Sequence, residues 1–162
     1  MMQTQDGITT IEAEDLPRVV EVWEASVRAT HHFLTEADIQ YIKSLVEDDL
    51  AQVETLLSVR DSNGQVIGFI GVEGDQVGAL FIHPDWRGQG IGRRLFTNAV
   101  ETLGATKVDV NEQNDQAVGF YRRMGFEVVG RSALDGLGQP FPLLHMRLSR
   151  LAQAAADVSG IA

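Results

Sequence analysis

The chain has 162 residues, no cysteine, and 23 acidic against 13 basic residues, for a formal net charge of −10. The missing cysteines exclude disulfides, thiolate metal sites and a cysteine nucleophile. The negative charge disfavours nucleic acid and anionic membranes as partners, because both bind mainly through positive charge. It is compatible with a cationic amine as a substrate.

The length predicts a single domain over residues 1–150, with residues 151–162 as a flexible tail. No apolar run is long enough to cross a bilayer, and the first six residues lack the regions of a secretory signal. Together with the absence of cysteine, this predicts a cytoplasmic protein that does not bind membranes.

The first half of the chain predicts a strand, two helices and three further strands. Residues 8–12 favour a strand, and a helix follows with Pro17 in its first turn. Its buried face is expected to contain Val19, Val20, Trp23 and Val27. The run from Thr35 to Asp38 has the form of a capping box, which predicts a second helix there. Strands are expected over 53–60 and 66–72 and in a segment that ends at residue 82.

The second half continues with alternating helices and strands. A helix begins near residue 91, and its apolar residues at helical spacing are Ile91, Leu95, Phe96 and Val100. A strand over 107–110, a helix over 114–124 and a strand pair over 126–134 and 141–148 follow. This order predicts an α/β fold with a mixed sheet and helices on both faces.

A glycine cluster joins an apolar strand to the helix at residue 91. It reads Arg87-Gly88-Gln89-Gly90-Ile91-Gly92. Unpaired N–H groups at a helix start bind anions, and glycines allow a phosphate close to the backbone. The Walker and dinucleotide patterns are both missing, which disfavours other nucleotide-binding classes. A tight turn without a ligand is the alternative for this motif alone.

A second motif strengthens the interpretation of the first. A strand ending at Val110 leads into Asn111-Glu112-Gln113-Asn114-Asp115-Gln116-Ala117-Val118-Gly119-Phe120-Tyr121, and Gly125-Phe126 follows. The two motifs, in this order, resemble the pyrophosphate loop and the Asn–Ala–Tyr signature of the GNAT superfamily of N-acetyltransferases. The resemblance extends loosely over residues 8–148.

The resemblance implies a fold and a cofactor. The GNAT fold has a mixed central sheet of about seven strands, and two splayed parallel strands form the cleft for acetyl-coenzyme A (acetyl-CoA). The implied cofactor-binding residues are the backbone of Leu80, Phe81 and Ile82, then Arg87, Gly88, Gln89, Gly90, Ile91, Gly92 and Arg93, and finally Asn114, Ala117 and Tyr121. No metal is implied.

The resemblance also implies acetyl transfer to an amine by direct attack within a ternary complex. Tyr121 is then the general acid that protonates the departing thiolate, and packing beside Phe120 is its alternative role. Asn114 is expected to bond the cofactor arm, to cap its own helix, or to do both. A module that binds acetyl-CoA without catalysis, as a sensor or interaction subunit, is the alternative function.

The general base is the least determined part of the site. Some GNAT members place a carboxylate on the strand before the glycine loop, and residues 76–82 contain none. His31 and His32 lie between the first two helices, and His32 is the candidate base. A third ligand at metal-site spacing is missing, which argues against zinc.

The acceptor is expected to be an amine of a small molecule, a peptide or a protein. The segment between the first two helices and the last strand pair are expected to contact it. The candidate acceptor-binding residues are Trp23, Arg28, His31, His32, Phe33 and Phe141. A homodimer is compatible with the resemblance, and no sequence feature selects its surface.

Overall fold

The computed structural model of the chain describes residues 7–149. These residues divide into two compact units, 7–105 and 106–149. The proposed tail over residues 151–162 lies outside the described residues. The expectation of one domain over residues 1–150 stays a prediction.

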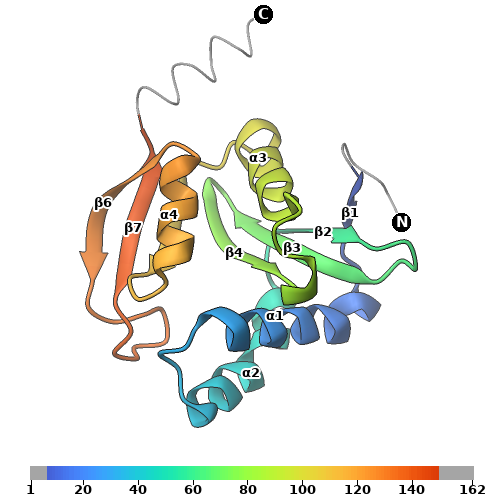
Figure 1. Cartoon of the computed structure of the whole chain (residues 1–162), viewed down its shortest axis with the longest axis horizontal. Coiled ribbons are helices and arrows are strands. Elements are labelled where there is room, and N and C mark those ends of the chain that lie inside the picture. Colours follow the sequence, from blue (N-terminus) through green and yellow to red (C-terminus); the bar gives the residue numbers. More distant parts are fainter. Residues whose placement is uncertain (1–6, 150–162) are drawn as a thin grey trace, which may run out of the picture. The chain divides into compact units, whose positions relative to one another are not determined.

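The first unit contains four strands and three α-helices (Figure 1). In chain order they are β1 (Ile8–Thr10), α1 (Leu16–Thr30), α2 (Glu36–Ala51), β2 (Thr55–Arg60), β3 (Val66–Glu73), β4 (Gln76–Ile82) and α3 (Ile91–Leu103). Short 3-10 helices, η2 (Ala13–Asp15) and η3 (Pro84–Trp86), precede α1 and α3. The strands follow the order β1-β2-β3-β4, and every neighbouring pair is antiparallel.

The second unit contains three strands and one α-helix. They are β5 (Lys107–Asn111), α4 (Asp115–Arg123), β6 (Phe126–Ser132) and β7 (Leu143–Leu148). β7 lies between β5 and β6 and is antiparallel to both. α4 packs against β5 and β6.

Helices α1 and α3 cover opposite faces of the strands in the first unit. Phe69 of β3 is buried in a cluster with α1 and α2, while a side chain at the neighbouring Gly68 would meet Ile91 of α3. Successive residues of a strand point to opposite faces. The central strand β3 is consequently buried on both sides, as the expectation of helices on both faces requires.

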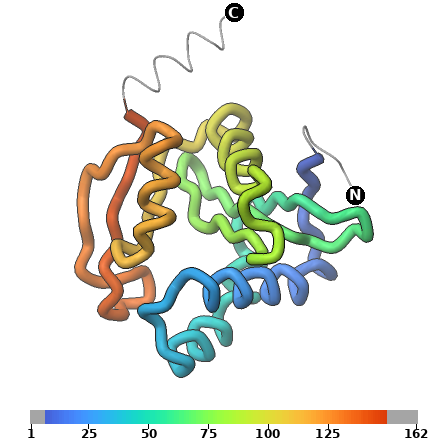
Figure 2. Tube along the Cα trace, in the orientation of Figure 1, coloured from blue at the N-terminus to red at the C-terminus, as the bar shows by residue number. Residues whose placement is uncertain are grey.

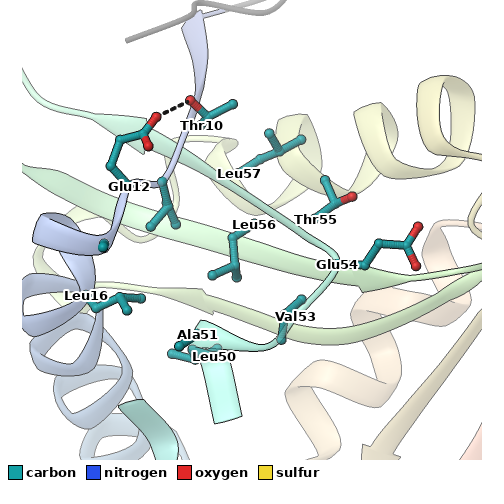
Figure 3. A pocket seen from close by; sticks show the side chains of 12 residues that line it. Thr10, Glu12, Leu16, Leu50, Ala51, Val53, Glu54, Thr55, Leu56 and Leu57 are labelled. Carbon is teal, nitrogen blue, oxygen red and sulfur yellow. Dashed lines mark hydrogen bonds between the residues drawn. The ribbon is translucent and has the colours of Figure 1, made fainter. Parts of the chain in front are cut away.

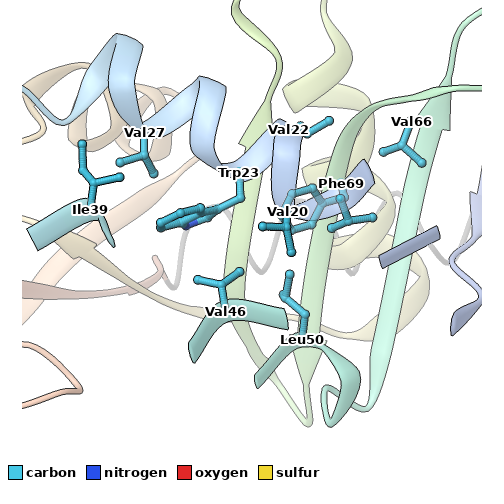
Figure 4. Close-up of a cluster of buried hydrophobic side chains, with 10 residues drawn as sticks. Val20, Val22, Trp23, Val27, Ile39, Val46, Leu50, Val66 and Phe69 are labelled. Carbon is cyan, nitrogen blue, oxygen red and sulfur yellow. The ribbon is translucent and has the colours of Figure 1, made fainter. Parts of the chain in front are cut away.

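A buried apolar cluster of the first unit lies between α1, α2 and β3 (Figure 4). Trp23 of α1 is 5% exposed, and the indole packs among apolar side chains of both helices. All four residues predicted for the buried face of α1 are buried: Val19, Val20, Trp23 and Val27. The helical spacing in the sequence therefore identified this face correctly.

Four strands are shorter than predicted: β1 ends at Thr10 instead of residue 12, β2 begins at Thr55 instead of residue 53, and the last strand pair is shortened on both sides of its connection. β6 ends at Ser132 and β7 begins at Leu143, so both are shorter than expected. The Asp135 side chain accepts hydrogen bonds from the backbone N–H groups of Leu137 and Gln139, which folds the intervening segment into a turn. Pro142 has no N–H group to donate to a strand ladder.

Across residues 7–149, the four helices are too short or too polar to traverse a lipid bilayer.

Candidate functional site

The glycine motif forms the connection between β4 and α3, and its path can be followed in Figure 2. The short helix η3 begins the connection, where His83 Nδ1 accepts a hydrogen bond from the backbone N–H of Asp85 at 3.2 Å. Gly88 and Gly90 then adopt left-handed conformations, with φ of +76° and +78°. A side chain at either position would point into open space. These two glycines are therefore required by backbone conformation rather than by packing.

Gly90 is the N-cap of α3, and this helix start has no capping side chain among the described residues. Its first turn contains no acidic residue, while Arg93 follows two residues after the helix begins. The first N–H groups of a helix have no acceptor within it, and the helix dipole makes this end partially positive. The loop thus offers backbone donors and positive potential to an anion.

The β4 residues expected to contact the cofactor are held in register by β3. Leu80, Phe81 and Ile82 pair with Ile70, Phe69 and Gly68 in turn. All three β4 side chains are half-buried. β3 occupies one edge of β4, and β4 is the last strand of its unit. The backbone groups on the other edge are those that the family resemblance assigns to the cofactor arm.

The two neighbouring histidines have different surroundings. His32 is exposed, whereas His31 is half-buried. The His31 ring lies 5.3 Å from the ring of Phe33 and 6.4 Å from that of Phe81, between centroids. Burial, with smaller contributions from Arg87 and His32, lowers the pKa of His31 to about 4. His31 is consequently neutral at neutral pH and lies beside the strand and loop assigned to the cofactor.

A threonine next to His31 determines which ring nitrogen holds the proton. The Thr30 hydroxyl donates its single hydrogen to the Ser26 carbonyl at 2.7 Å. His31 Nδ1 lies 2.8 Å from the same hydroxyl oxygen, so Nδ1 must be the donor in that bond. Nε2 of the neutral ring therefore has an unprotonated lone pair and has no hydrogen-bond partner among residues 7–149. This role of Thr30 was not predicted from the sequence, although the position of Thr30 directly before His31 is a usable signal.

Two other predicted acceptor residues have structural partners. The Arg28 guanidinium bonds Glu36 through two nitrogens, at 2.6 and 2.9 Å, and Glu24 at 2.9 Å. These ion pairs join α1 to the first turn of α2 and raise the pKa of Arg28. Trp23 is part of the core. The ion pairs of Arg28 and the burial of Trp23 account for both side chains without an acceptor substrate. The expected contact of these two residues with the acceptor stays a prediction.

The second motif forms helix α4 as expected. Asn114 is its N-cap, and its side-chain oxygen accepts a hydrogen bond from the backbone N–H of Ala117 at 3.2 Å. Tyr121, one turn after Ala117, is 6% exposed, and its ring meets that of Phe120 edge-on at 5.3 Å. Burial raises the pKa of the Tyr121 phenol, which keeps it protonated. The capping role of Asn114 is confirmed, and its cofactor role stays a prediction.

One hollow in the described part of the first unit lies away from the glycine loop, and another reaches it. A hollow of about 570 Å³ lies between the end of α2 and strands β1 and β2 (Figure 3). It shares no residue with the loop. A second hollow, of about 660 Å³, includes Gln89, Ile91 and Arg94. Among residues 7–149, no group of three or more histidine, aspartate or glutamate side chains is placed to hold a metal ion.

Comparison with known proteins identifies relatives of this chain. The family model for the acetyltransferase (GNAT) domain matches residues 23–149. The peptidyl-lysine N-acetyltransferase YjaB of Salmonella typhimurium is 44% identical over 133 residues, which cover 82% of this chain and 91% of that protein. The apo-form solution structure of YjaB from Escherichia coli has a TM-score of 0.79 at 40% identity, and the match covers 86% of this chain and 95% of that one.

A more distant structure shares the fold alone. The PaiA N-acetyltransferase of Thermoplasma acidophilum, solved in complex with coenzyme A, has a TM-score of 0.66 at 21% identity and covers 88% of this chain and 98% of its own. These similarities confirm the predicted fold class, an α/β GNAT fold with a mixed sheet of about seven strands. They also confirm that the chain is an acyltransferase. The chain belongs to the GNAT family of acetyltransferases.

Proposed function

We propose that this protein transfers the acetyl group of acetyl-CoA to the side-chain amine of a lysine in a peptide or protein. One observation carries the cofactor part: the α3 N-terminus begins with two left-handed glycines and has no capping side chain among the described residues. The 44% identical relative named as a peptidyl-lysine N-acetyltransferase supports the acceptor class. The net charge of −10 suits a cationic acceptor.

The proposed cofactor site uses the residues that the resemblance assigns. The pyrophosphate of acetyl-CoA accepts hydrogen bonds from the N–H groups of residues 88–92, since the predicted donor Arg87 N–H already donates to the Pro84 carbonyl at 3.3 Å. The side chains of Arg87 and Arg93 add positive charge. The amides of the pantetheine arm pair with the backbone of Leu80, Phe81 and Ile82. From α4, Asn114, Ala117 and Tyr121 complete the set.

The proposed reaction is a direct attack within a ternary complex. The neutral lysine nitrogen attacks the thioester carbonyl carbon, and the resulting tetrahedral oxyanion collapses with cleavage of the carbon–sulfur bond. The Tyr121 phenol, which burial keeps protonated, gives its proton to the departing thiolate. Proximity of the two bound substrates supplies much of the rate.

His31 is better supported than His32 as the group that accepts the amine proton. The Nε2 lone pair of His31 is available because Nδ1 donates to Thr30, and the ring lies against Phe81 of the proposed cofactor strand. His32 is exposed and remains the alternative base. If His31 is the base, His31→Asn lowers kcat by at least about tenfold, and His32→Asn has a smaller effect.

The first experiment is calorimetric titration with acetyl-CoA, with NAD and ATP as controls. Selective binding of acetyl-CoA is expected. Acetyl transfer to a lysine peptide, measured as release of the coenzyme A thiol, then tests catalysis in the unmodified protein and in Tyr121→Phe. An enzyme that uses Tyr121 as its acid keeps its affinity for acetyl-CoA but loses about 10²-fold or more in kcat in this variant. Binding without any turnover, in both proteins, would favour the sensor alternative.

A further inference from the structure

The second unit contains a hydrogen-bonded chain of three side chains that the proposed acetyltransferase site does not use. His145 Nδ1 lies 2.7 Å from Asp109 Oδ1, and His145 Nε2 lies 2.6 Å from Ser132 Oγ. The three residues come from three different strands: Asp109 from β5, His145 from β7 and Ser132 from β6. Sequence spacing alone does not connect them.

Strand register places all three side chains on one face. Asp109 lies directly opposite His145, and Ser132 is its diagonal neighbour, because Gly130 pairs with His145 and Ser132 with Leu143. The alternate residues on the other face are buried, among them Val108, Val110 and Met146. The three polar side chains thus lie on the more open face, where the side chains of Asp109 and His145 are each 36% exposed.

The direction of each hydrogen bond follows from the chemistry of the groups. An ionised carboxylate only accepts, so His145 Nδ1 carries the hydrogen that bonds Asp109. In the neutral ring Nε2 is then unprotonated, and it accepts the hydrogen of the Ser132 hydroxyl. A serine bonded to a histidine that a carboxylate orients is the arrangement that activates a serine nucleophile.

The backbone of β6 leaves space for the His145 ring. The β6–β7 pairing shifts register between Val128 and Gly130, which is a β-bulge beside His145. The His145 ring lies over Gly130, where an added Cβ would be 3.4 Å from the ring carbon Cδ2. Bulges commonly redirect side chains next to functional sites. Val129 and Leu134, which lie within three positions of Ser132 in the sequence, are 56% and 51% exposed and offer apolar surface to an acyl group.

We propose that Ser132 is a nucleophile that takes an acyl group from activated esters and thioesters, with His145 as its base and Asp109 as the residue that orients His145. Ser132 Oγ attacks the acyl carbon while its proton moves to His145 Nε2. The bond to the leaving group breaks, and His145 returns the proton to the departing oxygen or sulfur, which leaves an acyl ester on Ser132. Water, deprotonated by His145, then hydrolyses this ester and restores the serine.

The proposal does not depend on the acetyltransferase function. None of the three residues belongs to the predicted cofactor or acceptor sets. The competing explanation is a polar network that only ties the three strands together. That explanation predicts an effect of Ser132→Ala on stability at most, and no effect on acyl chemistry.

The test uses the full chain with p-nitrophenyl acetate as the acyl donor. We expect release of nitrophenol, an added acetyl mass that peptide mass spectrometry assigns to Ser132, and labelling of Ser132 by a fluorophosphonate. Ser132→Ala should lower the rate by at least about tenfold. Asp109→Asn should lower it by a smaller factor. Ser62→Ala, at an exposed serine in the β2–β3 turn, is the matched control and should leave the rate unchanged.

Two outcomes would overturn the proposal. One is an unchanged rate in Ser132→Ala, which would mean that a histidine or lysine reacts with the ester directly. The other is acetyl or fluorophosphonate label on residues other than Ser132 in the unmodified chain. The labelling measurement needs no variant, so it tests the role of Ser132 even if Ser132→Ala does not fold. Thermal unfolding of each variant shows whether a lost rate reflects a lost fold.

Discussion

Helices α2 and α3 belong to the same unit and begin in opposite ways. At the start of α2, the Thr35 hydroxyl accepts from the Asp38 N–H at 3.1 Å, and the Asp38 carboxylate accepts from the Thr35 N–H at 2.9 Å. Glu36 adds negative charge to that first turn. At the start of α3, the N-cap is Gly90, no described side chain caps it, and no acid is present in the first turn.

The two helix starts have the same physical requirement and meet it differently. At both starts the first N–H groups have no acceptor within the helix, and both carry partial positive charge. At the α2 start, the side chains of Thr35 and Asp38 accept hydrogen bonds from such N–H groups, so this end contributes to stability. The start of α3 has no such side chains, which leaves its donors for an anion from outside. The difference suits the α2 start to stabilising the fold and the α3 start to the anion of the proposed cofactor site.

The largest expected effect comes from giving α3 the negative charge that α2 has. Asparagine and aspartate both tolerate the left-handed conformation of Gly90 better than other side chains and have nearly the same size. We expect Gly90→Asp to bind acetyl-CoA at least about 100-fold more weakly than Gly90→Asn, because a carboxylate repels the phosphates at short range. Titration calorimetry at low and high salt measures this ratio. Equal dissociation constants for the two variants would place the pyrophosphate elsewhere.

The second expected effect concerns the pH dependence of stability that His31, near the loop before α3, produces. Burial lowers the pKa of His31 from 6.5 to about 4, so below pH 6.5 the unfolded chain takes up a proton that the folded chain refuses. The His31 contribution to stability is therefore complete above pH 6.5 and is lost as the pH falls towards 4, by about 2 to 3 kcal/mol. Urea unfolding between pH 7 and 4 measures the loss.

The matched variant for this prediction is His31→Asn, which removes the titrating group and keeps a polar side chain of similar reach. Its unfolding free energy should depend less steeply on pH over the same range. An identical slope in the unmodified chain and in His31→Asn would show that His31 is not buried as described.

The third expected effect concerns the side-chain cap at the start of α2. Thr35→Ala removes the capping hydroxyl of α2 and should lower the free energy of unfolding by about 1 kcal/mol. Its affinity for acetyl-CoA should be unchanged, because this helix start is not part of the proposed cofactor site. Chemical denaturation and calorimetry on the same preparation test both statements. A loss of affinity that matches the loss of stability would remove the distinction between the two helix starts.

The smallest expected effect concerns the exposed ion pair at the α2 start. The Arg28 guanidinium, with a smaller contribution from Gln40, lowers the pKa of Glu36 from 4.5 to about 2. Any stability from this carboxylate is present above pH 4.5 and is lost as the pH falls towards 2. Glu36→Gln should flatten the pH dependence of the melting temperature in that window by less than His31→Asn does between pH 6.5 and 4. Solvent and salt screen exposed pairs, so the difference should shrink in high salt.

Predictions from local pattern were accurate where neighbours in sequence decide the structure. The capping box at Thr35 and the N-cap at Asn114 are both present, since each needs only residues within three positions. The buried face of α1 followed from helical spacing. The end of β6 was placed two residues too late, because the Asp135 turn depends on backbone groups as far as Gln139.

Residue roles that depend on distant contacts were not predictable in this way. Nothing in the local sequence distinguishes His31 from His32, and only the packing against Phe81 of β4 does so. Asp15 is a comparable case. It pairs with Arg60 at 2.8 Å across 45 positions, and this bond is the largest cause of its lowered pKa.

The sequence by itself determined the family and the order of the elements, and it identified the helix start that is suited to an anion. Those features rest on backbone conformation and on short-range hydrogen bonds, which neighbouring residues specify. The tertiary structure alone decided that His31 is buried against Phe81 and bonded through Nδ1 to Thr30, and it joined Asp109, His145 and Ser132. Strand register and burial bring such groups together, and both are properties of the packed chain as a whole.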